Sequence, residues 1–311
     1  MSGRNKIDRR RFMGAAAPFA LAMPLVLRKD LVFGRGDYGP EDLAHTRQTL
    51  LAMVNRERAQ HGLSRLELDY LASKVATDHA RDMVDGLFLS HWSRDGQKPY
   101  QRYSFAGGTE ANQENAARLD DVSTDTAQEI EVSVVDLHQS MIDEHPPDDG
   151  HRQTILFPYH THVGFGVAAK PDHVRMVELY LARYAVIDPV PQSAQPGAQL
   201  IFSGRLLNPK HTMEGVHVYY EPFPQRPAME WLRIRRSYSL PDTFTDLWPR
   251  LEGKDVYSDG TKGTIETNLR GIFKTPLRLF NQPGINTIVV WITRTKEDLP
   301  FPITQICIRC G

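Results

Sequence analysis

The sequence predicts an α+β protein in which an α/β/α layered domain precedes an all-β, immunoglobulin-like sandwich. Three observations carry this prediction. Apolar residues recur at helical spacing before about residue 145, a proline-rich stretch without periodicity occupies residues 188–197, and short β-rich runs follow it. At 311 residues the chain also exceeds the size of one ordinary domain.

The N-terminus has the form of a twin-arginine export signal. Arg10 and Arg11 are followed by Phe12, and an apolar run over residues 15–27 comes next. This run is short and interrupted by proline, so it does not suit a transmembrane helix. We assign residues 1–36 to the signal and a disordered lead, and we expect release into the periplasm or outside the cell. An uncleaved anchor is the alternative.

The layered domain is expected over residues 37–187. The periodicity predicts helices over residues 41–60, 68–85 and 127–144, and strands over residues 163–167 and 173–184. His79 lies on the apolar stripe of the second helix, and we expect it to be a hydrogen-bonded core residue. No long period survives between residues 87 and 117, so loops or short elements are expected there.

The sandwich is expected over residues 198–311, after a linker over residues 188–197. Seven short β-rich runs predict its strands, over residues 200–207, 216–220, 232–238, 263–267, 272–280, 286–294 and 303–308. The Cys-Trp-Cys spacing of true immunoglobulin domains and any chemical motif are missing here. The expected role is therefore binding or spacing, by fold analogy alone.

Composition excludes some partners. The chain is 41% apolar and 24% charged, as soluble globular proteins are, and its net charge is -1. This balance offers no electrostatic attraction to polyanions, which argues against nucleic acid as a partner. The one tight basic cluster, Arg233, Arg235 and Arg236, is expected on the solvated face of a strand.

Two cysteines are too few to form the scaffold of this protein. Cys307 and Cys310 are three residues apart, so on a strand they face opposite sides. We expect a local disulfide or two inert thiols. A redox role and half of a zinc site are the alternatives, although no second Cys pair completes a four-thiolate site.

Two imidazoles and two carboxylates occur in four short segments. These segments are residues 90–96, 114–117, 141–144 and 150–152. Each lies beside an apolar stretch, so folding is expected to bring the polar groups together, where they satisfy one another or hold something charged. Glu144 continues the apolar stripe of the helix over residues 127–144, so it must be paired, protonated or exposed at the helix end.

The order of these segments resembles the CAP superfamily, the cysteine-rich secretory, antigen-five and pathogenesis-related proteins, in its bacterial form. The resemblance covers about half the chain and rests on residues 51–58, 61–63, 89–91, 114–115, 150–156 and 163–167. In that family a His, Glu, Glu, His tetrad lines a central groove. The resemblance implies this role for His91, Glu114, Glu144 and His151. Met141 stands where the family usually has Trp.

The resemblance implies binding, because the family is known chiefly for binding lipids and, in some members, divalent metal at the tetrad. We favour an exported protein that binds a small lipid-like ligand or envelope component, a divalent metal such as zinc at His91 and His151, or both. Two alternatives stay open. One is a metal-dependent hydrolase of envelope peptides or esters, and the other is a structural tetrad with an adhesion or interaction role.

Catalytic motifs do not decide between these alternatives. The sequence contains neither a His-Glu-x-x-His segment nor a Gly-x-Ser-x-Gly elbow, so no catalytic residue is assigned and an enzyme is the less favoured reading. His160 and His162 alternate as metal ligands on a strand do, but we expect them to be exposed loop residues. The remaining histidines considered are expected at the surface, namely His138, His145 and His173.

Overall fold

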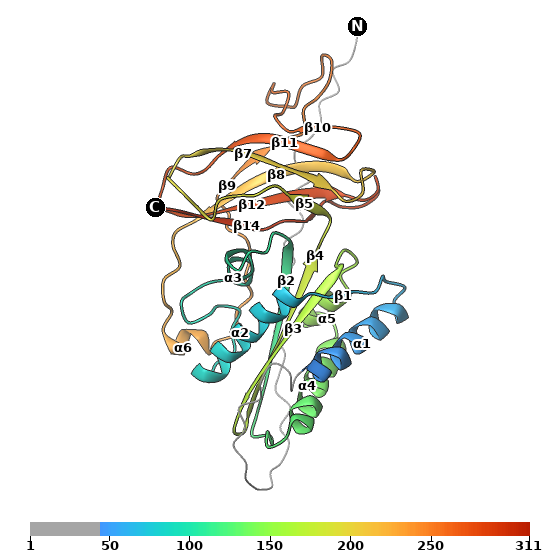
Figure 1. Ribbon diagram of the computed structural model, residues 1–311, viewed down its shortest axis with the longest axis vertical. Helices are drawn as coiled ribbons and strands as arrows, with labels where there is room; N and C mark the ends of the chain where they lie inside the picture. The colour runs from blue at the N-terminus through green and yellow to red at the C-terminus, as the bar shows by residue number, and fades with distance from the viewer. Residues whose placement is uncertain (1–43) are drawn as a thin grey trace.

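The computed structural model describes residues 44–311. The expected twin-arginine signal and lead, residues 1–36, lie outside the described residues. Figure 1 shows two stacked parts, a helix-flanked sheet below and two β-sheets above. The fold class is confirmed as an α/β/α layered domain followed by a β-sandwich. Within the described range no helix is long and apolar enough to cross a membrane.

Six helices occur in the described part of the chain. They are α1 (Ala44–Gln60), α2 (Tyr70–Gly86), α3 (Pro99–Phe105), α4 (Ala127–Ile142), α5 (Gly150–Ile155) and α6 (Met229–Leu232). The three helices expected from periodicity correspond to α1, α2 and α4. Capping side chains fix two of their starts, because Asp69 accepts from the Ala72 N–H and Thr126 accepts from the Glu129 N–H.

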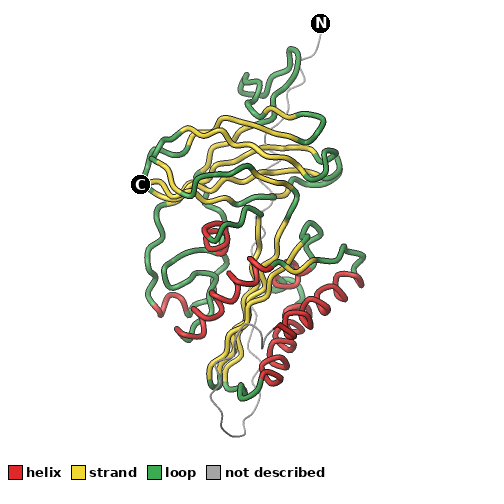
Figure 2. Tube along the Cα trace, viewed as in Figure 1, coloured by secondary structure: helices red, strands yellow, loops and turns green. Residues whose placement is uncertain are grey.

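The first sheet has the strand order β1-β3-β4-β2. Its strands are β1 (Glu67–Leu68), β2 (Ala111–Asp120), β3 (His162–Lys170) and β4 (His173–Ala182). Figure 2 shows α2 on one face and α1 and α4 on the other. Leu50 of α1 and Ile130 of α4 share one buried cluster with Val163, while Met83 of α2 and Val177 share another. The edge strand β2 was not expected.

Two glycines let α2 lie directly on β3. A Cβ added to Gly164 would overlap the Ser73 backbone nitrogen, and one added to Gly166 would overlap the Ala76 carbonyl carbon. The helix backbone therefore contacts the strand where side chains would otherwise separate them.

Replacing Gly166 with Ala is expected to lower the free energy of unfolding by about 1–3 kcal/mol, because the methyl group forces α2 away from β3. Urea unfolding followed by circular dichroism measures the loss. Ala169→Ser, at a half-buried position of the same strand, is the control, with a change of less than about 0.5 kcal/mol. Equal stability of Gly166→Ala and the parent would contradict the close approach.

The sandwich consists of two sheets. One has the order β10-β11-β7-β5 and the other β6-β14-β12-β8-β9, with β13 paired to β12. The strands are β5 (Ala185–Ile187), β6 (Ser193–Ala194), β7 (Gln199–Leu206), β8 (Thr212–Glu221), β9 (Phe244–Leu247), β10 (Glu266–Thr267), β11 (Ile272–Arg278), β12 (Gly284–Thr293), β13 (Phe301–Pro302) and β14 (Ile306–Cys310). Phe202 and Leu277 of one sheet share a buried core with Val218 and Ile288 of the other.

One expected strand is wrong. Residues 232–238 form the end of α6 and a loop, so Arg233, Arg235 and Arg236 do not lie on a strand. They belong to the connection between β8 and β9, residues 222–243, which leaves the sandwich and runs to α2 (Figure 1). Leu232 of this connection is fully buried in the α2 cluster. Tertiary burial has overridden the local β pattern.

Hydrogen bonds join the sandwich firmly to the layered domain. The β2 strand begins where Glu110 pairs with Thr304, and the Ala111 N–H donates to the Ile303 carbonyl at 3.0 Å. The buried end of Glu221 accepts from the hydroxyl of Tyr100 at 2.6 Å. The two parts therefore share a polar, well-satisfied contact at the start of the edge strand.

The two cysteines are both buried and unpaired. They lie on β14 and face opposite sides, as the strand alternation predicts, because Cys310 joins the sandwich core and Cys307 packs with Tyr100. Burial raises the pKa of Cys307 to about 12. A thiol held protonated in this way is unreactive at neutral pH.

Candidate functional site

The first His–Glu pair joins His91 to Glu114. His91 lies in the loop after α2, and its Nδ1 is 2.9 Å from the Glu114 Oε1. Glu114 was expected on a loop or short element but lies within the ten-residue strand β2, which pairs with β4 along its whole length. The His91 side chain is 20% exposed and that of Glu114 2%. Only the imidazole of this pair reaches the surface.

Arg102 of α3 binds both members of the first pair through its guanidinium. Its guanidinium donates to the Glu114 Oε2 at 2.6 Å and to the His91 carbonyl oxygen at 2.8 Å. Burial raises the pKa of the Glu114 carboxyl, but Arg102 and the neighbouring imidazoles outweigh burial and lower this pKa to about 2. An ionised carboxylate only accepts, so the His91 Nδ1 carries the hydrogen of this bond, and Nε2 is the ring nitrogen that takes no part in it.

The second pair joins His151 to Glu144. Glu144 lies just beyond α4, and its Oε1 is 2.5 Å from the Nδ1 of His151 in the first turn of α5. The other carboxylate oxygen accepts the backbone N–H groups of His151 at 2.9 Å and Arg152 at 3.4 Å. The His151 side chain is 31% exposed and that of Glu144 is 9% exposed. Of the states expected for Glu144, the structure shows the paired one.

The two pairs are linked through consecutive residues of the edge strand β2. Glu114 belongs to the first pair, and the next residue, Asn115, donates its Nδ2–H to the His151 carbonyl oxygen at 3.2 Å. Neighbouring residues of a strand point to opposite faces. Because Asn115 contacts only the backbone of His151, the two His–Glu pairs flank β2, which is the edge strand of the sheet.

Zinc requires more ligands than these pairs offer. Over residues 44–311, no group of three or more His, Cys, Asp or Glu side chains is placed to hold a metal ion. Each carboxylate of the tetrad already accepts from an imidazole Nδ1, which leaves two Nε2 atoms. An open zinc site takes three protein ligands, so these two nitrogens would supply only part of a zinc coordination shell. Zinc at His91 and His151 stays a prediction.

Tyr238 covers the first pair from the β8–β9 connection. Its hydroxyl accepts from the Glu114 backbone N–H at 3.0 Å, and its ring centroid lies 4.9 Å from that of His91. Burial raises the pKa of Tyr238 above its ordinary value. A segment of the sandwich therefore completes the wall around His91. Sequence reasoning missed Tyr238, because no local signal connects residues 124 positions apart.

A buried network beneath the second pair was also missed. His138 was expected at the surface, but its side chain is 0% exposed and its Nδ1 lies 2.7 Å from Oε1 of Glu178, which is also 0% exposed. The Tyr180 hydroxyl donates to the other carboxylate oxygen at 2.8 Å, and Asn115 donates there at 3.3 Å. Asn115 thus links this network to His151.

The remaining histidines do not join the site. His160 was expected to be exposed but is buried, with its Nδ1 3.1 Å from the Thr154 carbonyl oxygen. His162 is half-buried and its Nε2 lies 3.7 Å from a Glu67 carboxylate oxygen.

His145 is exposed as expected, and His173 is half-buried beside Asp120. His79 is a core residue as predicted, because its Nε2 donates to the Ser90 carbonyl at 2.8 Å.

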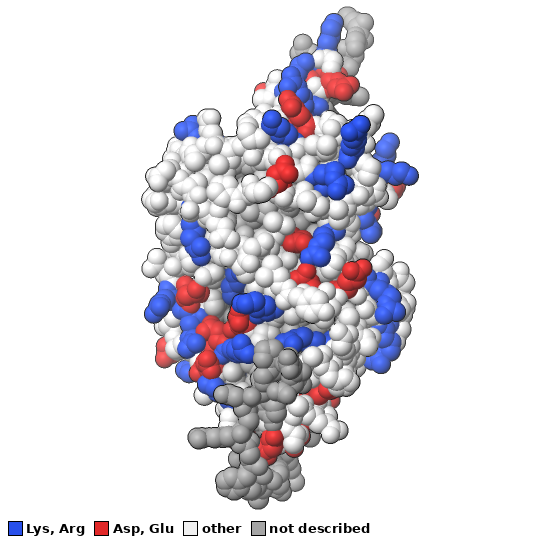
Figure 3. Space-filling model, in the orientation of Figure 1, with Lys and Arg blue, Asp and Glu red and all other residues white. Residues whose placement is uncertain are grey.

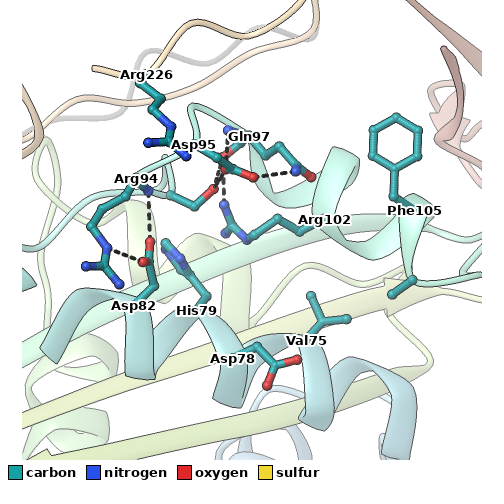
Figure 4. A pocket seen from close by; sticks show the side chains of 12 residues that line it. Val75, Asp78, His79, Asp82, Arg94, Asp95, Gln97, Arg102, Phe105 and Arg226 are labelled. Atoms are coloured by element: carbon teal, nitrogen blue, oxygen red, sulfur yellow. Dashed lines mark hydrogen bonds and ion pairs between the residues drawn. The ribbon is translucent and has the colours of Figure 1, made fainter. Parts of the chain in front are cut away.

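A hollow of about 660 Å³ lies behind the first pair. His79 and Arg102 lie at its base, and Arg226 of the β8–β9 connection reaches it from the opposite side (Figure 4). Asp82 and Arg94 form an ion pair within it at 2.5 Å. Charged side chains of both signs line this hollow beside Val75, Phe105 and Ala106, so its wall combines polar and apolar surface.

Several proteins resemble part of this chain. The uncharacterized protein YkwD of Bacillus subtilis is 27% identical over 127 residues, which are 41% of this chain and 44% of that protein. An extracellular protein containing a SCP domain from Bacillus anthracis is 22% identical, with 48% of this chain and 45% of that chain covered and a TM-score of 0.37. An outer surface protein from Borrelia burgdorferi is 19% identical, with 49% and 99% covered and a TM-score of 0.37.

A family model matches the part of the chain that carries the tetrad. Residues 51–183 match CAP, the cysteine-rich secretory protein family. This stretch extends from α1 to just beyond β4 and contains both His–Glu pairs. Residues 51–183 of this chain therefore form a domain of the CAP family.

Proposed function

We propose that this chain is an exported binding protein whose tetrad holds the polar head of a small lipid-like molecule. The observation that carries the proposal is the shared arrangement of the two pairs. His91 and His151 are each partly exposed, and each is held at Nδ1 by a carboxylate that is itself less than 10% exposed. Side chains oriented in this way present their Nε2 atoms outward at little cost in rotamer entropy.

The chemistry of these nitrogens sets the class of ligand. A neutral imidazole whose Nδ1–H donates to a carboxylate keeps a lone pair on Nε2, which accepts a hydrogen bond. A hydroxyl group of a lipid-like molecule supplies such a donor. A divalent metal is the alternative occupant of the same lone pairs, with its further ligands coming from water or a bound molecule.

The electrostatics of Glu114 favour binding over hydrolysis. A general base works best with a pKa near the operating pH. The carboxylate of Glu114 has its pKa lowered to about 2, since Arg102 and two imidazoles surround it within a buried site. Such a weak base does not activate water efficiently at neutral pH, and its place is to orient His91.

Export is part of the proposal. The paired arginines before residues 15–27 are typical of a twin-arginine signal, and a binding protein of envelope molecules must reach the envelope. The absence of a membrane-crossing helix among residues 44–311 is compatible with release after processing.

Replacing His91 or His151 with Ala is expected to reduce ligand occupancy about tenfold each, because one oriented hydrogen bond to the ligand is lost. The measurement uses exported, folded protein. Bound lipids are extracted and quantified by mass spectrometry, and zinc uptake by the dialysed protein is measured by elemental analysis.

His173→Ala is the matched control. His173 is also partly exposed and also held at Nδ1 by a carboxylate, that of Asp120 at 2.8 Å, but it lies outside the tetrad. Its replacement should leave occupancy unchanged. Protein that carries neither lipid nor zinc, or that loses occupancy equally in all three variants, would contradict the proposal.

A further inference from the structure

The sandwich has an apolar and cationic tip at the end of one sheet. We define the sandwich tip by two adjacent turns and the strand ends beside them. It consists of Arg205, Leu207, Lys210, Leu269, Arg270, Ile272 and Lys274. All seven side chains are exposed. Figure 3 shows Lys and Arg gathered over this end of the upper part of the molecule.

Backbone pairing holds the two turns side by side. The Leu206 N–H donates to the Gly271 carbonyl oxygen at 2.9 Å, and Arg205 lies directly opposite Ile272 in the register of β7 and β11. Leu269 is 98% exposed, while Leu207 is 48% and Ile272 43% exposed. An apolar side chain that projects almost entirely into solvent from a fixed turn indicates a contact surface.

The cations of the tip have no carboxylate partner among the described residues. No ion pair joins Arg205, Lys210, Arg270 or Lys274 to an acidic side chain. Across the sheet, Glu266 faces Lys274 in the strand register but pairs with Arg250 at 3.6 Å. A second acid, Asp188, accepts a hydrogen bond from the Ser203 hydroxyl. The tip therefore carries uncompensated positive charge.

The combination of groups selects one partner. A second copy of this chain would bring the same four cations face to face, which like charges oppose. A soluble polyanion would satisfy the cations but leave Leu269 in water. An anionic bilayer offers negative headgroups at its surface and hydrocarbon just beneath them, which suits both kinds of side chain.

We propose that the sandwich tip docks on an anionic membrane surface, with Leu269 inserted at the headgroup boundary and the cations on the headgroups. This inference does not depend on the function proposed for the tetrad, which lies in the layered domain. It gives the C-terminal sandwich a role, namely to hold the layered domain beside the membrane.

Cosedimentation of the full chain with vesicles tests the proposal. The protein is expected to bind vesicles of 30% phosphatidylglycerol in phosphatidylcholine and not vesicles of phosphatidylcholine alone. Arg270→Glu should weaken binding about thirtyfold, since each charge near an anionic surface contributes a factor of about five. Leu269→Ser should weaken binding about tenfold.

Matched controls lie in the layered domain. Arg65 is exposed and without an ion pair among the described residues, and Tyr70 is 82% exposed. Arg65→Glu and Tyr70→Ser should bind vesicles like the parent. Binding that ignores phosphatidylglycerol, that is equally weak in tip and control variants, or that goes to a soluble polyanion such as dextran sulfate without help from Leu269 would overturn the proposal.

Discussion

Replacing Glu114 with Ala is expected to lower the free energy of unfolding at pH 7 by about 3–5 kcal/mol. The carboxylate is the common partner of Arg102 and His91, and its side chain is only 2% exposed. Its removal leaves a largely buried guanidinium without its counter-charge. Because the pKa of Glu114 is lowered to about 2, this contribution is present above about pH 4.5 and lost as the pH falls towards 2.

Urea unfolding at pH 7 measures this loss. Glu67→Ala is the control, because Glu67 also faces a histidine, at 3.7 Å, but its side chain is 83% exposed. Its replacement should change stability by less than about 0.5 kcal/mol. If Glu114→Ala lost no more stability than Glu67→Ala, the carboxylate would not anchor the site.

Helices and central strands were predictable because their buried positions carry apolar residues at regular spacing along the sequence. The stripe of α4 includes Ile130, Val134 and Leu137, and all three are buried in one cluster with the sheet. The strands β3 and β4 are mostly apolar and almost wholly buried, since helices cover both of their faces.

The β8–β9 connection was not predictable from the same patterns. Trp231 and Leu232 are apolar because they pack on α2 and Trp92, not because they pair in a sheet. The ring centroids of Trp92 and Trp231 lie 5.2 Å apart although about 140 residues separate them. A local period records that a residue is buried, but it does not record which distant element buries it.

The site was predictable in its tetrad but not in its supports. His138 shows what local reasoning overlooked, because it continues the series Ile130, Val134 and Ile142 at steps of four along α4. A histidine on that row is buried and needs a hydrogen-bond partner. Glu178, in the middle of the buried strand β4, is that partner. Arg102 and Tyr238 do not lie on a periodic row of buried residues, so no sequence pattern marked them as partners of Glu114.

Stability is expected to fall steeply as the pH drops below about 6.5, before the Glu114 carboxylate begins to titrate. Burial and a neighbouring arginine lower the pKa of His79 to about 4 and that of His160 to about 3. Burial lowers the pKa of His217 to about 4. Each imidazole stays neutral in the folded protein but takes up a proton on unfolding. Stability from these three groups is therefore full above pH 6.5 and lost as the pH falls.

Three such protons correspond to a slope of about 4 kcal/mol per pH unit near pH 5. Because domains of this kind are stable by about 5–15 kcal/mol, we expect acid unfolding between about pH 5 and pH 4. Urea unfolding at intervals from pH 7.5 to pH 5 measures the slope. His217→Phe, which keeps a ring against Phe244 at 5.0 Å, should remove about one third of the slope.

His45→Ala supplies the control for this slope, since the His45 side chain is 83% exposed and its loss should leave the pH dependence unchanged. A stability that stays level from pH 7 to pH 5 would mean that the three imidazoles take up protons over the same pH range in the folded and the unfolded protein. In that case His79, which lies 3.9 Å from Glu114, would be a second cation on that carboxylate. The acid slope therefore also reports whether His79 is charged beside the first His–Glu pair. A charged His79 would compete with His91 for the same oxygen of Glu114.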